Sequence, residues 1–100
     1  MNLSERDFRV GDIVQHFKRT TLSDEELMTD LYLYQIIAVA MHTESGDDLV
    51  VYKACYLDRN GEYRYFARPV EEFVGKIDRA KHPDCKQEYR FVVVSRPSKC

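Results

Sequence analysis

The stretch LYLYQIIAVAMHTESGDDLVVYKACYL, residues 31–57, decides the fold of this chain. Two apolar runs, Leu31–Met41 and Leu49–Leu57, flank the polar segment 42–48. Periodicity alone leaves a buried helix open for the first run, but its β-branched residues favour a strand covered on both faces. We therefore predict a β-hairpin at the centre of one small sheet.

Three further strands are predicted around this hairpin. Ile13–Lys18 follows a Gly-Asp turn, and Tyr89–Val94 is the last apolar run of the chain. Tyr63–Ala67 follows the pair Asn60-Gly61, which is typical of a type I′ turn, and should pair back on the second arm of the hairpin. Short strands of this number predict a mainly β fold, a small antiparallel barrel or roll of about five strands.

Two short helices are expected between the strands. Ser23 and Glu26 have the spacing of a capping box inside the polar segment 19–30, which we interpret as an inserted loop or short helix. Pro69–Val74 begins with proline and continues with acidic residues, both favourable in a first helical turn.

Composition indicates one soluble domain. The chain has 100 residues, of which 44% are hydrophobic and 32% charged, so we expect a single domain over 1–100 with an ordered core over 11–94 and a tail over 95–100. No apolar run is long enough for a membrane helix, and the charged N-terminus lacks the apolar core of a secretory signal. Three irregularly spaced cysteines fit free thiols in a reducing compartment. We therefore expect a cytoplasmic protein that does not contact membranes.

Net charge bears on the choice of partner. The formal charge of −2 disfavours bulk nucleic acid, because non-specific affinity requires several Lys or Arg side chains facing the phosphates. A local basic stripe is still compatible with this total. The sequence carries no information on the oligomeric state.

The chain resembles a known family in several short pieces that occur in a fixed order. The pieces are His16-Phe17-Lys18, Ile37-Ala38 leading to His42-Thr43-Glu44, Leu49-Val50-Val51-Tyr52, and Arg68-Pro69 with Phe73. In order and spacing they resemble the short bacterial proteins grouped as the domain-of-unknown-function 1653 family. The resemblance implies a small SH3-like barrel and no known activity.

Two departures from the family pattern stand out. Where the family usually has a glycine after the His-Phe-Lys triplet, this chain continues into the segment 19–30. Such an insert could cover a site or bind a partner of its own. Where the family commonly has Trp-Val before Arg-Pro, this chain has Phe66-Ala67, so a role for an indole at that place does not transfer.

The candidate binding residues combine an imidazole, a carboxylate, a phenol and a guanidinium at one predicted rim of the sheet. They are His42, Glu44, Tyr52 and Arg68, with His16 and Lys18 nearby. The planar guanidinium of such a group can hold a carboxylate or phosphate through two hydrogen bonds. We predict a non-catalytic binding module that takes a small anionic ligand or a peptide at this rim, without a cofactor.

Two other interpretations of the same residues remain open. In a structural one, Glu44 pairs with Arg68 and His42 caps the hairpin turn. In an enzymatic one, Glu44 or His42 acts as general base and Arg68 stabilises developing negative charge, which requires these groups within about 3 Å of one another or of a shared space. No motif in the chain dictates a reaction, so the sequence leaves enzymatic activity undecided.

Metal binding is disfavoured. His42 and Glu44, with the acids of the same turn, have ligand types that suit a divalent ion, but acid-rich turns are usually solvated. His82 and Cys85 have the spacing of half a zinc site and lack a second pair nearby.

A tyrosine-rich sheet face is a third candidate surface. Exposed rings could stack single-stranded bases or hold a cation, whereas packed rings would only stabilise the sheet through cross-strand pairs. The adaptor interpretation therefore requires exposed rings at Tyr32, Tyr34, Tyr52, Tyr56, Tyr63 and Tyr65.

Overall fold

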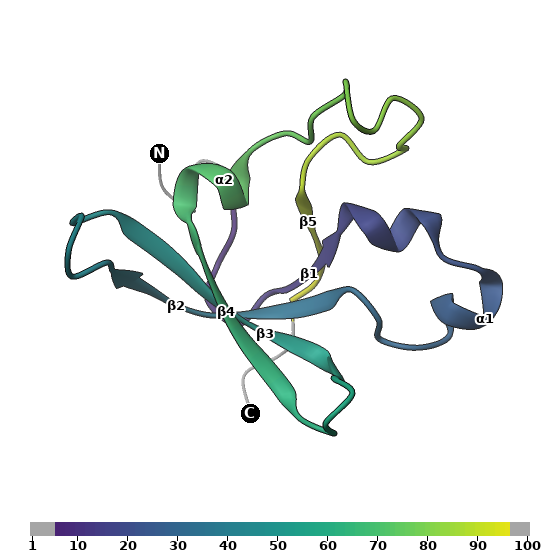
Figure 1. Ribbon diagram of the computed structural model, residues 1–100, viewed down its shortest axis with the longest axis horizontal. Helices are drawn as coiled ribbons and strands as arrows, with labels where there is room; N and C mark the ends of the chain where they lie inside the picture. The colour runs from purple at the N-terminus through teal and green to yellow at the C-terminus, as the bar shows by residue number, and fades with distance from the viewer. Residues whose placement is uncertain (1–5, 97–100) are drawn as a thin grey trace.

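The protein folds around one antiparallel sheet of five strands (Figure 1). The structure, a computed structural model, describes residues 6–96. Across the sheet the strands lie in the order β4-β3-β2-β1-β5. In chain order the elements are β1 (Ile13–His16), the 3₁₀ helix η2 (Phe17–Thr21), α1 (Asp24–Leu27), β2 (Leu33–Met41), β3 (Asp48–Leu57), β4 (Tyr63–Pro69), α2 (Val70–Val74) and β5 (Phe91–Ser95).

The predicted central hairpin is confirmed. β2 and β3 pair antiparallel from Met41 opposite Asp48 to Tyr34 opposite Ala54, so the first apolar run is a strand from Leu33 onward and not a helix. The register shifts between Ile36 and Ala38. A bulge of this kind bends the strand and increases its twist, which curls the sheet toward its inner face.

The core lies on that inner face. Alternate residues of the central strands are buried there, and α2 covers them. The ring of Phe73 in α2 stacks on Phe91 of β5 at a centroid distance of 4.2 Å and meets Tyr52 of β3 edge-on at 5.3 Å. The cluster comprises Phe8, Val14, Tyr34, Ile36, Val50, Tyr52, Ala54, Val70, Phe73, Val74 and Phe91.

The sheet is curled but not closed. β4 and β5 are its two edges and do not pair with each other. Because α2 follows β4 directly and its Phe73 contacts both Tyr52 and Phe91, side-chain packing joins the two ends of the sheet where a barrel would have hydrogen bonds. The predicted mainly β class is confirmed as an antiparallel roll, and the term barrel is too strong.

Two local predictions need correction: the type of the turn at 58–62 and the residue at which β1 ends. The turn at 58–62 contains one residue with positive φ, Gly61 at +75°, and Gly61 N donates to Asp58 O at 3.0 Å. A type I′ turn would need positive φ at Asn60 as well, so the turn is instead a type I turn followed by a bulge glycine. β1 ends at His16 because the chain continues as η2.

The last strand extends into the predicted tail. β5 extends to Ser95, the first residue of the predicted tail, and residues 97–100 of that tail lie outside the described residues. No helix within 6–96 has the length and apolarity needed to cross a membrane.

Candidate functional site

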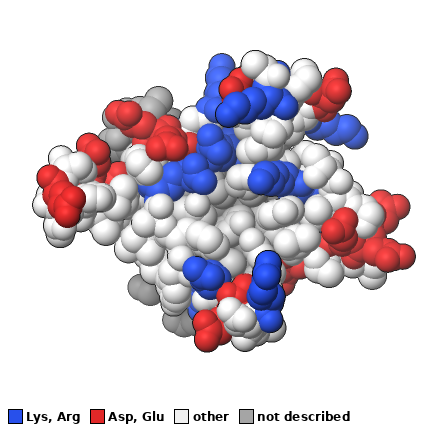
Figure 2. Space-filling model, viewed as in Figure 1, with Lys and Arg blue, Asp and Glu red and all other residues white. Residues whose placement is uncertain are grey.

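A pocket rich in cationic side chains lies where the end of β1, the end of β4 and the 77–90 segment meet. Its volume is about 280 Å³, and four of its lining residues are cationic: Lys18, Arg68, Lys81 and Arg90. Asp78 is the one carboxylate among the lining residues. Figure 2 shows Lys and Arg side chains on both sides of this hollow, and Asp and Glu side chains both at the outer ends of the molecule and directly next to Lys and Arg. We call this cavity the cationic pocket.

Arg68 enters the pocket from the inner face of the sheet. It pairs with Val50 in the β3–β4 ladder, and Val50 is fully buried, so the two side chains lie on the same face. Its Nε donates to the Tyr52 hydroxyl at 3.3 Å, and its Nη1 lies 3.6 Å from Glu72 Oε1. These contacts hold the guanidinium in one orientation at the mouth of the roll.

His16 forms the floor of the pocket at the end of β1. Only 9% of the residue is exposed, and its Nδ1 accepts a hydrogen bond from Lys18 N at 3.1 Å. Burial, together with the nearby charges of Lys18, Arg90 and Arg68, lowers the pKa of His16 from 6.5 to about 4. The imidazole is therefore neutral at pH 7, and because Nδ1 is an acceptor, its proton is on Nε2.

Arg90 reaches the pocket from the residue before β5. Its backbone N donates to Gly75 O at 3.0 Å and its carbonyl accepts from Phe17 N at 2.9 Å. Its side-chain Nε is buried and makes no hydrogen bond to any part of the chain from Arg6 to Arg96. A buried N–H without an acceptor costs free energy, so an acceptor delivered by a ligand would stabilise it.

Lys81 and His82 are held by a tight turn that begins at Asp78. The backbone N atoms of Lys81 and His82 donate to Asp78 O at 3.1 and 3.0 Å, and the Asp78 carboxylate accepts from Ala80 N at 2.9 Å. The carboxylate thus caps its own turn. The His82 ring packs on Phe17 at a centroid distance of 4.7 Å.

The structure brings four of the six predicted binding residues together. His16, Lys18 and Arg68 line the cationic pocket, and Tyr52 contacts it through Arg68. His42 and Glu44 do not line it. They lie in the exposed β2–β3 turn, where His42 Nδ1 accepts from Glu44 N at 3.1 Å.

The structural interpretation predicted two contacts, a His42 cap and a pair between Glu44 and Arg68, and only the first is present. His42 does cap its turn, because its Nδ1 also accepts from Ser45 N at 3.3 Å. The carboxylate that pairs with Arg68 is Glu72, one helical turn further along the chain, and not Glu44.

The chain is similar to a known protein family. The model of the family described as Protein of unknown function (DUF1653) matches residues 12–93. The chain belongs to this family. No curated protein and no solved structure matches the chain significantly. The DUF1653 match includes every residue that lines the cationic pocket. The SH3-like likeness implied by the sequence resemblance stays a prediction.

Sequence reasoning missed Lys81 and Arg90, and it considered His82 only as half of a zinc site. Lys81 and Arg90 lie in a segment predicted as an irregular loop followed by a strand, and no motif or spacing marks them. The available signal was compositional, because Lys and Arg recur along 76–90. Placing them beside His16 required knowledge that β5 pairs with β1.

The other candidate sites are not assembled by the fold. Within 6–96, no three His, Cys, Asp or Glu side chains lie close enough together to hold a metal ion. The tyrosines do not share one face: Tyr34 and Tyr52 are 7% and 5% exposed, whereas Tyr63 and Tyr65 are 50% and 59% exposed. The Tyr34 and Tyr56 hydroxyls lie 2.8 Å apart, so the inner rings pack on one another as cross-strand pairs.

Proposed function

We propose that this DUF1653 protein is a non-catalytic binding module that holds a small phosphate-bearing anion in the cationic pocket. The charge balance of the pocket carries the proposal. Four cationic side chains and one carboxylate, Asp78, line the pocket, and Asp78 already accepts a backbone hydrogen bond from its own turn. When Glu72 is counted as well, because it lies 3.6 Å from Arg68, the four cations still outnumber the two carboxylates. An excess of positive charge of this size favours a doubly charged anion over a single carboxylate.

The hydrogen-bond donors of the pocket support a phosphate in particular. Arg90 has a buried Nε without a partner among the described residues, and Arg68 is oriented by Tyr52. Planar guanidinium groups match phosphate oxygens better than ammonium groups do. The neutral His16 ring adds a donor at Nε2 and no competing charge.

Pocket size supports a small ligand. At about 280 Å³ the cavity is just below the range of roughly 300 to 1,000 Å³ that is typical of sites for drug-sized molecules. A peptide would need a longer groove, so a small anion fits this cavity better.

The enzymatic alternative lacks a suitable base. His42 and Glu44 lie in the exposed turn, and His16, with a pKa of about 4, binds a proton only weakly at neutral pH. Asp78 is committed to its turn. Since general acid–base catalysis works best when the pKa of the group is near the working pH, the arrangement favours binding over a reaction.

Titration with inorganic phosphate at constant ionic strength tests this proposal. We expect phosphate to raise the melting temperature of the wild type and to bind Arg68→Gln at least about ten-fold more weakly, because a charged hydrogen bond is lost. Arg59→Gln is the matched control, since Arg59 is exposed in the β3–β4 turn and does not line the pocket. If phosphate at about 10 mM leaves the wild type unchanged, or if both variants bind like the wild type, the proposal is wrong.

A further inference from the structure

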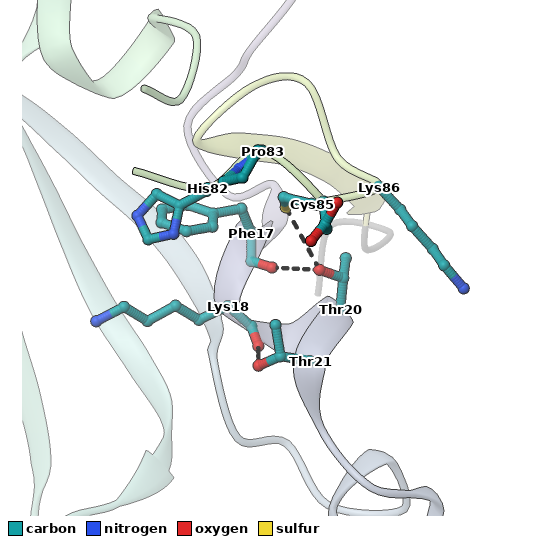
Figure 3. A pocket seen from close by; sticks show the side chains of 9 residues that line it. Phe17, Lys18, Thr20, Thr21, His82, Pro83, Cys85 and Lys86 are labelled. Atoms are coloured by element: carbon teal, nitrogen blue, oxygen red, sulfur yellow. Dashed lines mark hydrogen bonds between the residues drawn. The ribbon is translucent and has the colours of Figure 1, made fainter. Parts of the chain in front are cut away.

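A second cavity adjoins the cationic pocket. Its volume is about 510 Å³, and it shares Phe17, Lys18 and His82 with the cationic pocket. Figure 3 shows Phe17 and His82 together on one side, Cys85 with Thr20 on the other, and Lys18 extending past His82 away from Cys85. We call this cavity the ring pocket, and the tilted ring pair of Phe17 and His82 lies between it and the cationic pocket.

The two cavities differ in chemistry. Most of the surface that lines the ring pocket is apolar, whereas that of the cationic pocket is mostly polar. The Phe17 and His82 ring centroids lie 4.7 Å apart with the rings tilted by 57°, and because Phe17 is only 5% exposed, His82 and Pro83 present most of the flat surface. Such surfaces favour a planar aromatic group, which stacks at little cost in conformational freedom.

The polar groups of the ring pocket, which also include the side chains of Asp84 and Lys86, offer two threonine hydroxyls as acceptors. The hydroxyl of Thr20 donates to Phe17 O and that of Thr21 donates to Lys18 O, each at 2.7 Å. With its single hydrogen committed, each hydroxyl can still accept through a lone pair. A heteroaromatic ring that carries an amino group would satisfy these oxygens.

We propose that the two pockets hold one ligand, a free phosphate monoester of an amino-bearing heteroaromatic nucleoside. The phosphate lies among Arg68, Arg90 and Lys81, and the ring packs against Phe17 and His82 in the adjoining cavity. This inference rests on the proposed function of the cationic pocket. Lys18 lines both cavities, so its ammonium can contact the phosphate from the shared wall.

Isothermal titration of the wild-type chain with four probes tests the inference. The probes are inorganic phosphate, glucose 6-phosphate, adenosine 5′-monophosphate and adenosine. Because the aromatic ring adds stacking contacts, we expect the nucleoside monophosphate to bind at least about ten-fold tighter than phosphate or glucose 6-phosphate. Adenosine alone should bind more weakly than its monophosphate, since it lacks the charged group.

Two substitutions at Cys85 locate the ring. Cys85 is half-buried in the ring pocket, with its Sγ 3.6 Å from Thr20 Oγ1, and it does not line the cationic pocket. Cys85→Phe would fill the cavity and should bring the nucleoside monophosphate down to the affinity of phosphate while leaving phosphate binding unchanged. Cys85→Ala keeps the cavity open and should bind like the wild type. Unchanged phosphate affinity in Cys85→Phe also shows that this variant is folded.

The outcomes separate this inference from the proposed function. If phosphate binds but the nucleoside monophosphate binds no tighter, or if Cys85→Phe leaves its affinity unchanged, the ring pocket assignment is wrong and the cationic pocket stands. If no phosphate binds, both proposals are wrong. If a short 5′-phosphorylated oligonucleotide binds tighter than the monophosphate, the ligand class is overturned in favour of nucleic acid.

Discussion

His16 is a buried imidazole that faces several positive charges. Its Nδ1 accepts from Lys18 N, and burial together with Lys18, Arg90 and Arg68 lowers its pKa to about 4. In the unfolded chain the same group has a pKa near 6.5. Between these two values the unfolded state binds a proton that the folded state does not, so acidification favours unfolding.

We predict that this difference appears in the pH dependence of stability. Above pH 6.5 His16 is neutral in both the folded and the unfolded state and does not change the free energy of unfolding. As the pH falls from about 6.5 toward about 4, the free energy of unfolding decreases progressively. Between pH 7 and 4.5, the free energy of unfolding of the wild type should fall by about 2 kcal/mol more than that of His16→Asn. Urea denaturation at both pH values measures this, and the Asn Oδ1 can still accept from Lys18 N.

His82→Asn is the control for this comparison. His82 is in the same pocket but is less buried than His16. Its variant makes the same change from imidazole to amide in the same pocket and leaves the buried His16 in place. Parallel curves for the wild type and His16→Asn would contradict the linkage to His16.

At the scale of elements, the inserted segment between η2 and β2 is held by one arginine. The Arg19 guanidinium donates to Leu27 O at 2.8 Å, Thr29 O at 2.9 Å and Leu31 O at 2.7 Å. All residues from 23 to 30 are exposed, so the segment has little apolar burial of its own. The predicted capping box of Ser23 and Glu26 is present and begins the single turn of α1.

We predict that Arg19→Ala loosens this segment selectively. Hydrogen exchange and limited proteolysis should become faster within 22–31 and stay unchanged in β2 and β3. The three acceptors can be rehydrated by water, so the global free energy of unfolding should fall by only about 1 kcal/mol. Arg19→Lys should restore the segment only in part, because an ammonium group lacks the planar fork that reaches several carbonyls. Uniformly faster exchange across the sheet would contradict this local role.

At the scale of the whole molecule, an ion pair between the buried Asp12 and the exposed Arg96 joins the two ends of the described chain. Asp12, in the turn before β1, is 1% exposed, and its Oδ1 lies 2.9 Å from Arg96 Nε just after β5. Arg96 Nη2 also reaches Asp12 Oδ2 at 3.1 Å, which makes the pair bidentate. Because β5 pairs in the sheet with β1 alone, this contact reinforces one edge of the roll.

We predict that Asp12 and Arg96 are energetically coupled in stabilising the fold. Arg96→Gln should lower the urea midpoint, because it leaves a buried carboxylate without its cationic partner. Asp12→Asn should also be destabilising, and the double variant should lose less than the sum of the two single losses. Additive losses in the double-mutant cycle would show that the contact does not stabilise the fold. Arg9→Gln, an exposed arginine of the same turn, is the matched control and should change the midpoint little.

The sequence by itself determined the hairpin of β2 and β3, the β4 return at Gly61, the acidic capped turn at Ser23 and the short helix after Pro69. Each of these depends on residues close together in the chain, through alternation, turn chemistry or capping. Such local signals are readable without knowledge of the rest of the fold. For the same reason the sequence also placed Arg68 at the end of the strand that begins at Tyr63.

Only the tertiary structure decided which of these residues meet. The sequence interpretation joined His42 and Glu44 to Arg68, but the hairpin turn projects outward and Arg68 points inward from β4. The cationic pocket depends instead on β5 pairing with β1, which brings Arg90 next to His16. Pairing between the first and last strands depends on how the whole sheet curls around its core, so no local pattern along the chain encodes it.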